Sequence, residues 1–323
     1  MVRTGNNAYL KYGWESTFAG AATVDKKFGL QDSLSSWSLT HNRQDLAALN
    51  QVTYNDYAYG QQAGSFSVDF VLSNPWIFRS MLGTPSYAST TWTYPHATNG
   101  INKTPQTFTT EIGFNASDSA NGDIVRTLKG CVADSLSINT SVGGTVGCSL
   151  SATYGNEDEP TTTFGTAPTK PTVAFPYTFA HANFKWAGSV VAQVQDVSIN
   201  IGQSSALLYG LNSNQAVDAY RQVLDISGSF RASVVNKNLL ENMLDQISVG
   251  TGATYNETVS GSPALEISFT KSATEHITLT GTGLSPSDLS YDGIRPNEPI
   301  FESVNWRIKS LVVTAKNSQV SEE

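Results

Sequence analysis

The feature that most constrains this chain is an internal repeat spanning about half of its 323 residues. The stretch GSFSVDFVLSNPWIFRSMLG at residues 64–83 is echoed by GSFRASVVNKNLLENMLD at residues 228–245, an offset of 164. Upstream of this motif, LAALN at 46–50 is matched by LYGLN at 208–212, an offset of 162. A colinear series of matches with a nearly constant offset indicates a duplicated unit.

Each unit is predicted to consist mainly of β-strands with one short helix. Within residues 64–70, apolar side chains alternate with small polar or acidic ones, which is the period of a strand with one buried face. The apolar segments 74–82 and 236–247 have helical spacing, and Asn74 followed by Pro75 is typical of a helix start. Further strands are expected near 107–115, 122–139 and 144–154 in the first unit, and near 264–271, 275–282 and 300–315 in the second.

The composition of the chain and a proline-rich segment near its middle favour two domains. Charged residues make up only 14% of the chain, which suits a β protein rich in turns. The stretch NEDEPTTTFGTAPTKPTVAFP at 156–176 contains four prolines and is typical of a linker. We therefore expect a first β domain with an N-terminal arm over 1–157, a Pro/Thr-rich linker over 158–176, and a second β domain over 177–323.

The charge and the cysteines exclude several classes of protein. A net charge of −8 argues against tight binding of nucleic acid through its phosphates. No apolar stretch reaches the length of a secretory signal or a membrane span, so we expect a chain made in the cytoplasm. A hairpin turn at Gly143-Gly144 would place Cys148 opposite Asn139 and Cys131 opposite Asn156. The two cysteines would then not face each other, which predicts two buried free thiols.

No pattern in the chain indicates a catalytic centre, a metal site or a cofactor. The four histidines are far apart in sequence, and neither a G-x-S-x-G nor a phosphate-binding glycine motif is present. NEDEP at 156–160 and DSANGD at 118–123 contain the oxygen side chains of a cation site, but an acidic linker and a hairpin loop explain them better. We therefore expect no enzyme. A β-sandwich glycosidase is the least favoured alternative, because its two carboxylates can converge from distant positions.

Three stretches match, in order, a pattern known from one family. YGWESTFAG at 12–20 is similar to a Gly-x-Glu-Ser-Thr-(Phe/Tyr)-Gly start, although the final glycine is displaced by one residue, to Gly20. Residues 64–83 are similar to a glycine-rich strand that leads into an apolar helix ending Leu-Leu-Gly. Residues 129–155 are similar to a later hairpin with a serine-rich strand. Together these stretches resemble the tail tube proteins of long-tailed viruses of bacteria and archaea.

The resemblance implies a mainly β fold with two tandem tail-tube-like β-barrel or β-sandwich domains, each flanked by one short α-helix. Six such domains would form a ring whose inner sheets join around a lumen, and stacked rings would form the tube through which viral DNA passes without specific binding. Two domains per chain imply homotrimeric rings with pseudo-sixfold symmetry, with a homohexamer as the alternative. The implied partners are a tape measure protein, a tail terminator and baseplate or tip proteins. The implied location is the virion tail, assembled in the host cytoplasm.

Two sets of residues are candidates for this function. The polar strand positions expected to face the lumen are Ser33, Ser35, Asp69, Ser137, Asn139, Ser198 and Asn200, for which an ordinary solvent-facing position is the alternative. The long segments 84–106 and 248–263, the linker and the N-terminal arm are expected to contact neighbouring subunits, and the residues singled out there are Trp92, Tyr94, His96, Tyr255 and Asn256. The runner-up function is a tandem β-sandwich binding or adhesion module of a virion or cell surface, favoured by the aromatic run at 92–96.

Overall fold

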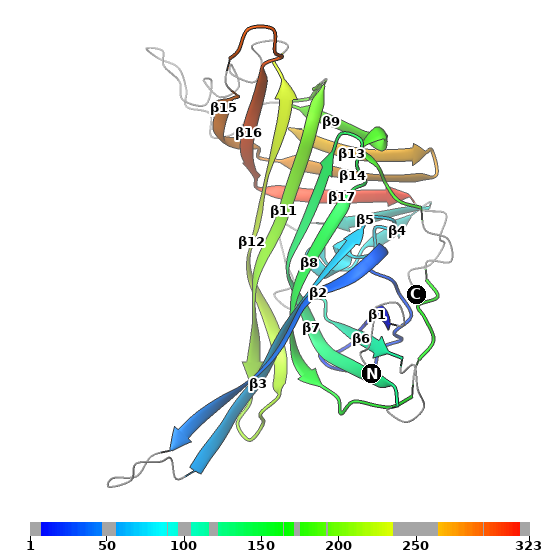
Figure 1. The fold of residues 1–323 in the computed structure, drawn as a ribbon, viewed down its shortest axis with the longest axis vertical. Coiled ribbons are helices and arrows are strands. Elements are labelled where there is room, and N and C mark those ends of the chain that lie inside the picture. The colour runs from blue at the N-terminus through cyan, green and yellow to red at the C-terminus, as the bar shows by residue number, and fades with distance from the viewer. Residues whose placement is uncertain are drawn as a thin grey trace.

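The chain is mainly β, and its strands form two antiparallel sheets (Figure 1). The computed structural model describes residues 8–46, 56–88, 90–95, 105–115, 122–163, 165–170, 175–191, 193–234, 264–292 and 294–316. The mainly β prediction is therefore confirmed, as a sandwich of two packed sheets. Within these ranges neither sheet closes on itself into a barrel.

The larger sheet has ten strands, eight of which follow one another in the order β15-β16-β12-β11-β7-β8-β3-β2. The remaining two branch from β7, because β6 pairs with β7 and β1 pairs with β6. The strands of this sheet are β1 (Ala8–Trp14), β2 (Leu30–Leu46), β3 (Asp56–Val71), β6 (Phe108–Phe114), β7 (Ile124–Ser141), β8 (Gly147–Glu157), β11 (Val194–Tyr209), β12 (Ala216–Ser233), β15 (Ser285–Tyr291) and β16 (Phe301–Ile308).

The smaller sheet has seven strands in the order β10-β9-β13-β14-β17-β5-β4 and covers the upper part of one face of the larger sheet in the view of Figure 1. Its strands are β4 (Ser86–Ala88), β5 (Thr91–Pro95), β9 (Ala182–Trp186), β10 (Ser189–Val190), β13 (Leu265–Ser272), β14 (Glu275–Thr282) and β17 (Ser310–Lys316). A short helix α1 (Phe78–Leu82) and a 3-10 helix η2 (Phe179–His181) complete the described elements.

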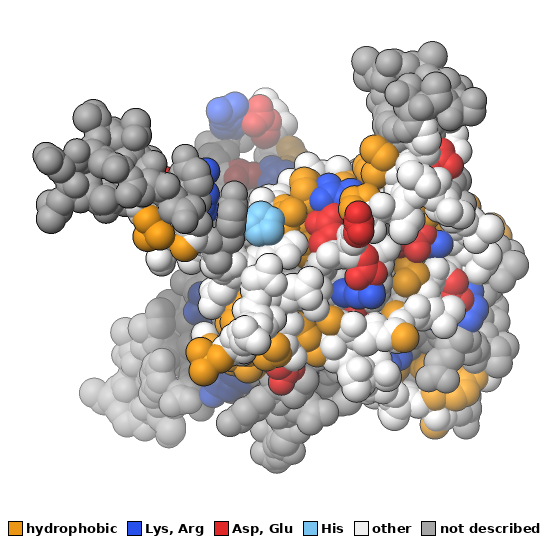
Figure 2. Space-filling view, turned by 90° about the horizontal axis from the view of Figure 1, so that it is seen from below, with side chains coloured by type: hydrophobic (Ala, Val, Ile, Leu, Met, Phe, Trp, Pro, Cys, Tyr) orange, Lys and Arg blue, Asp and Glu red, His pale blue; other side chains and the backbone are white. Residues whose placement is uncertain are grey.

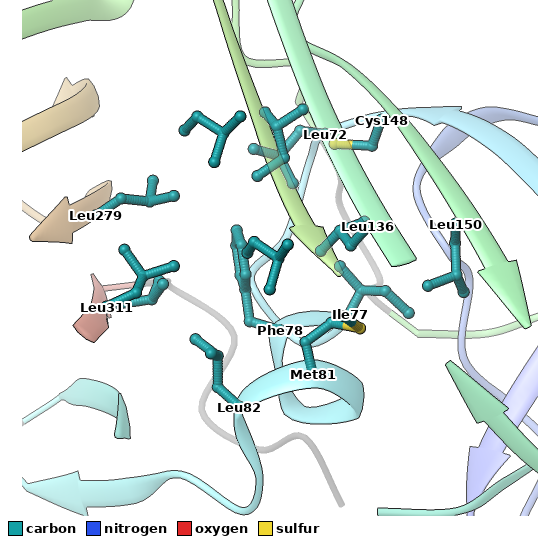
Figure 3. Close-up of a cluster of buried hydrophobic side chains, with 14 of the residues drawn as sticks. Leu72, Ile77, Phe78, Met81, Leu82, Leu136, Cys148, Leu150, Leu279 and Leu311 are labelled. Carbon is teal, nitrogen blue, oxygen red and sulfur yellow. The ribbon is translucent and has the colours of Figure 1, made fainter. Parts of the chain in front are cut away.

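One core lies between the sheets and around α1 (Figure 3). Phe78 and Met81 of the helix are fully buried, and Leu136 of the large sheet and Leu279 of the small sheet belong to the same cluster. The alternation in residues 64–70 explains the strand side of this core. Its apolar positions Phe66, Val68 and Phe70 are at most 3% exposed, as a strand with one buried face requires.

The two halves of the repeat are joined in both sheets. In the large sheet β7 of the first half pairs with β11 of the second, and in the small sheet β5 pairs with β17. The expected linker also bonds to the first half, since Thr161 and Val125 exchange backbone hydrogen bonds. The domain boundaries at 157 and 177 remain predictions.

Most expected strands are present, and three local expectations were wrong. The strand expected over 300–315 is two strands in different sheets, because the buried alternation of β16 breaks where Ser310 and Leu311 are both buried. The irregular segment expected over 84–106 contains β4 and β5. Helix α1 is shorter than 74–82, since Asn74 Oδ1 accepts a hydrogen bond from the Trp76 amide (3.1 Å) in a turn before the helix. The helix expected over 236–247 lies outside the described residues.

The cysteines are both free and buried, as expected, and they do not face each other. Cys131 lies opposite Tyr154 and Cys148 opposite Ile138. The register differs from the prediction by one position at Cys148, because the turn is centred one residue earlier than Gly143-Gly144. It differs by two positions at Cys131, because β7 also has a bulge between Ala133 and Ser135. The Gly144 amide donates to the Ser141 carbonyl (2.9 Å), and Gly143 adopts φ +78° at the third position of the turn.

Candidate functional site

The polar face of the large sheet, on the side away from the core, holds all seven residues predicted to line a lumen. The strand period dictates this arrangement, since every second side chain points away from the core. Ser33, Ser35, Asn139 and Asn200 are exposed, whereas Asp69, Ser137 and Ser198 are partly covered by their neighbours. The sequence alternation therefore identified one continuous surface. That this surface faces a lumen remains a prediction.

One lateral row of this face crosses all eight strands of the ordered path. Its neighbouring pairs are Ser33–Asp69, Asp69–Ser149, Ser149–Ser137, Ser137–Asn200, Asn200–Ser227, Ser227–Arg307 and Arg307–Ser285. Four of the predicted residues lie in this row, and the row passes from the first half to the second between Ser137 and Asn200. The polar face is thus built jointly by both halves.

Short side chains on this face bond mainly to one another and to the backbone. The hydroxyls of Ser198 and Ser229 lie 2.9 Å apart across β11 and β12. Asn305 Nδ2 donates to Asp288 Oδ2 at 3.4 Å, and Ser35, at a bulge in β2, donates its hydroxyl to the Ser67 carbonyl at 3.2 Å. These bonds leave a surface of small hydroxyls and amides with few long side chains.

The charged groups of this face are mostly acidic. Asp69, Asp196, Asp225, Asp288 and Asp292 lie on it or at its β15 edge, against two arginines, Arg231 and Arg307. Arg307 lies 3.7 Å from Asp225, and Arg231 forms an ion pair with Asp292. Burial raises the pKa of Asp196, which Arg231 partly offsets. Neither arginine therefore presents an unpaired positive charge to a passing anion.

Seen from below, the molecule also places opposite charges side by side. Figure 2 shows acidic and basic side chains next to each other on an otherwise uncharged surface. Adjacent charges of opposite sign cancel over short distances, so they create no strong basic patch on this side of the molecule.

The motif at 12–20 forms a structural anchor beside this sheet. Glu15 is 4% exposed, and its carboxylate accepts hydrogen bonds from the Thr109 hydroxyl (2.7 Å), the Gly130 amide (2.9 Å) and the Ala19 amide (2.9 Å). One side chain thereby connects β1, β6, β7 and the turn after β1. Sequence reasoning singled out this stretch only through the family resemblance.

The residues predicted at subunit contacts are only partly described. Trp92 (9% exposed) and Tyr94 (0%) lie on β5 and point into the core, where the rings of Tyr94 and Phe78 are 6.2 Å apart. His96, Tyr255 and Asn256 lie outside the described residues. The contact role of these five residues stays a prediction. The aromatic run that favoured an adhesion module has its two described rings inside the protein.

Sequence reasoning missed a set of exposed apolar side chains on the hairpin of β11 and β12, which extends beyond the core (Figure 1). It contains Leu208 (42% exposed), Leu211 (103%), Val217 (55%), Tyr220 (38%) and Val223 (76%). Large apolar side chains that are exposed on one projecting hairpin are typical of an interaction surface. The signal that could have found them is LYGLN at 208–212, an apolar run at the position where β11 ends.

Among the residues that the structure describes, no group of three or more His, Cys, Asp or Glu side chains is arranged to hold a metal ion. The described part of the chain also has no helix with the length and hydropathy that crossing a bilayer requires.

The family model described as phage tail tube protein matches residues 5–308, which includes both halves of the repeat. No curated protein matches the chain.

Proposed function

Since this chain belongs to the phage tail tube protein family, we propose that its polar sheet face lines the lumen of a tail tube built from stacked rings. Membership of the family makes the chain a structural component of the viral tail. The proposal adds which surface faces the DNA and how many chains form a ring. It rests on the lateral row from Ser33 to Ser285, because that row runs without interruption through both halves.

Three chains per ring fit the sheet best. Each chain contributes eight strands in lateral order, and the two halves contribute four each. With strands about 4.8 Å apart and tilted by about 40°, a closed cylinder from three chains would be about 50 Å across between backbones. Short serine and asparagine side chains would leave most of that width open to a DNA duplex. A homohexamer is the alternative.

The lumen would act through weak contacts. Phosphates bind proteins chiefly through lysine and arginine, and an acidic wall repels them. In this chain the two arginines of the polar face are paired with aspartates. Hydroxyl and amide groups offer brief hydrogen bonds that exchange readily with water. DNA would therefore slide through without being held at any sequence.

The proposed assembly would also involve particular partners and a particular place of assembly. The tube would form around a tape measure protein in the host cytoplasm and be closed by a tail terminator at one end. Baseplate or tip proteins would hold its other end. The exposed apolar side chains of the β11–β12 hairpin would contact a neighbouring ring, since they are open to solvent in the single chain.

Electron microscopy of the purified protein tests the ring, and charge reversal tests the lumen. Rings with a central pore and three-chain mass are expected, whereas chains that remain monomeric at high concentration would overturn the proposal. Virions carrying Asp69→Lys with Asn200→Lys should eject DNA more slowly at low salt and recover at high salt. Thr270→Lys, at an exposed position of the small sheet, is the matched control. Equal ejection by both variants would refute the lumen assignment.

A further inference from the structure

The two halves of the large sheet repeat the same four-strand arrangement. The second half contributes β15-β16-β12-β11, and the first contributes β7-β8-β3-β2, in the same lateral order. In each half a long hairpin, β2–β3 or β11–β12, is paired through its second strand with a later antiparallel pair, β7–β8 or β15–β16. Strand β2 thus corresponds to β11, and β7 corresponds to β15.

A pair of serine hydroxyls and a glycine under an aromatic ring occur in both halves, and they define which residues correspond. The hydroxyls of Ser38 and Ser65 lie 2.8 Å apart across β2 and β3, and those of Ser198 and Ser229 lie 2.9 Å apart across β11 and β12. Each hairpin also has a bulge at the same place, after Leu34 in β2 and after Val194 in β11.

The second detail is a glycine covered by an aromatic ring. In β3, Gly64 lies under the ring of Tyr154 on β8, and in β12, Gly228 lies under the ring of Trp306 on β16. Because both pairs join equivalent strands, Gly64 and Gly228 are equivalent positions. The two halves can therefore be superposed in register.

Inside the chain, the halves are joined where β11 pairs with β7. At this junction Asn200 lies opposite Ser137, and Ile201 lies opposite Leu136. Ile201 and Leu136 are both fully buried. The junction therefore joins the outer strand of one hairpin to the first strand of the other half's later pair, and it completes the core at that point.

The same two types of strand form the free edges of the large sheet. In the described ranges, β2 pairs only with β3, and β15 pairs only with β16. Trp37 and Leu39 of β2 stay partly exposed, whereas their equivalents Val197 and Ile199 are 6% and 3% exposed. Tyr291 of β15, the equivalent of Leu136, is 47% exposed. Each edge lacks the partner that its internal equivalent has, and open edges favour pairing with another chain.

We infer that β2 of one chain pairs with β15 of a second copy in the antiparallel register of the internal junction, an inference that rests on the proposed ring. Thr40 is the equivalent of Asn200, since their partners Ala63 and Ser227 directly precede the equivalent glycines. Asp292 is the equivalent of Ser137, because Asp292 directly follows Tyr291, Ser137 directly follows Leu136, and Tyr291 and Leu136 are equivalent.

Thr40 of one copy therefore lies opposite Asp292 of the next. Every chain offers one edge of each type, so the contact repeats head to tail and closes into a ring without any free edge. The β11–β7 junctions within chains and the β2–β15 contacts between chains then alternate around the ring.

A pair of cysteine variants tests this register. Directly opposite residues have Cβ atoms about 4.5–5.5 Å apart and diagonal ones about 7–8 Å, so only the former approach the separation that a disulfide needs. Assembled rings of Thr40→Cys with Asp292→Cys should oxidise to covalently linked chains on non-reducing gels. Thr40→Cys with Ser290→Cys, on the same strands and face but two residues out of register, is the matched control and should link at least tenfold less.

The possible outcomes distinguish a failure of the proposed β2–β15 contact, here called the seam, from a failure of the proposed function. Stronger linking of the control pair, or no linking in rings verified by microscopy, overturns the seam while leaving the ring intact. Absence of rings from the unmodified protein instead overturns the proposed function. If the variants do not assemble, hydrogen exchange of the unmodified protein decides. Amides of residues 36–42 should exchange more slowly in rings than in dissociated chains, and unchanged exchange there refutes the seam.

Discussion

Replacing Gly64 by alanine tests whether the packing of β3 against β8 depends on the absence of a side chain. A Cβ at position 64 would stand closer than 3.0 Å to the ring and hydroxyl oxygen of Tyr154, a separation that real Cβ atoms do not show. The Tyr154 ring is fully buried, and its hydroxyl donates to the Ser38 carbonyl at 3.0 Å. The ring therefore cannot move aside without giving up this bond and displacing its neighbours.

The cost follows from these contacts. Forcing a methyl group into a packed core costs about 1–3 kcal/mol, and losing the hydrogen bond of Tyr154 adds about 0.5–1.5 kcal/mol. Alanine offsets about 0.4–1 kcal/mol, because it restricts the unfolded chain more than glycine does. We expect Gly64→Ala to lower the free energy of unfolding by about 2–3 kcal/mol.

Urea denaturation of the dissociated chain, followed by tryptophan fluorescence, measures this change. Gly147→Ala in β8 is the matched control, since its nearest neighbour, the Asn139 carbonyl, would be 3.9 Å from the new Cβ. The control should be neutral or slightly stabilising. In a Tyr154→Leu background, which removes the ring, Gly64→Ala should cost at least 1 kcal/mol less, as expected for residues in contact, which couple by about 0.5–3 kcal/mol. Equal midpoints for Gly64→Ala and Gly147→Ala would refute the reasoning.

Three further predictions concern buried polar groups. Glu15→Ala leaves three hydrogen-bond donors without their acceptor and should lower the free energy of unfolding by roughly 3 kcal/mol or more, whereas Glu15→Gln should cost less; equal urea midpoints for the two variants would contradict this. Burial raises the pKa of Asp134, so its stabilising contribution is complete below the ordinary aspartate value and is lost as the pH rises through the raised one. Asp134→Asn should therefore stabilise the chain at pH 7, with a gain that shrinks toward about pH 3.9; a gain that grows in acid would contradict it. Burial also raises the pKa of the Cys131 and Cys148 thiols, so N-ethylmaleimide labelling followed by mass spectrometry should detect modification only on unfolding, and rapid labelling of the native chain would contradict it.

The sequence predicted which face each strand presents, because alternation reports burial one residue at a time. This is why β6, β7 and β8 lie close to their expected ranges and why all seven predicted lumen residues share one face. Alternation does not report which strand lies next to which. The pairing of β7 with β11 and of β5 with β17 therefore could not be predicted, although the repeat contained the information that the two halves are alike.

The segment after the first helix, which contains β5, also shows that alternation alone does not identify a strand's neighbours. Thr91, Trp92, Thr93 and Tyr94 alternate as a strand should, but the length and the aromatic residues of the segment 84–106 favoured a functional loop. The rings of Trp92 and Tyr94 are core side chains in the chain itself. An aromatic run between turn residues indicates a short strand as readily as a binding loop, and only a neighbouring strand such as β17 decides between them.

The pairing of β7 with β11 has a consequence for synthesis on the ribosome. Strand β7 is complete at Ser141, but β11 is complete only at Tyr209. At about 5–20 residues per second, the roughly 70 intervening residues take about 4–14 seconds to translate. During that interval the nascent first half exposes a strand edge whose partner does not yet exist. A β11 from a neighbouring ribosome fits the same edge, so crowding of translating ribosomes on one message would favour chains that exchange their second halves.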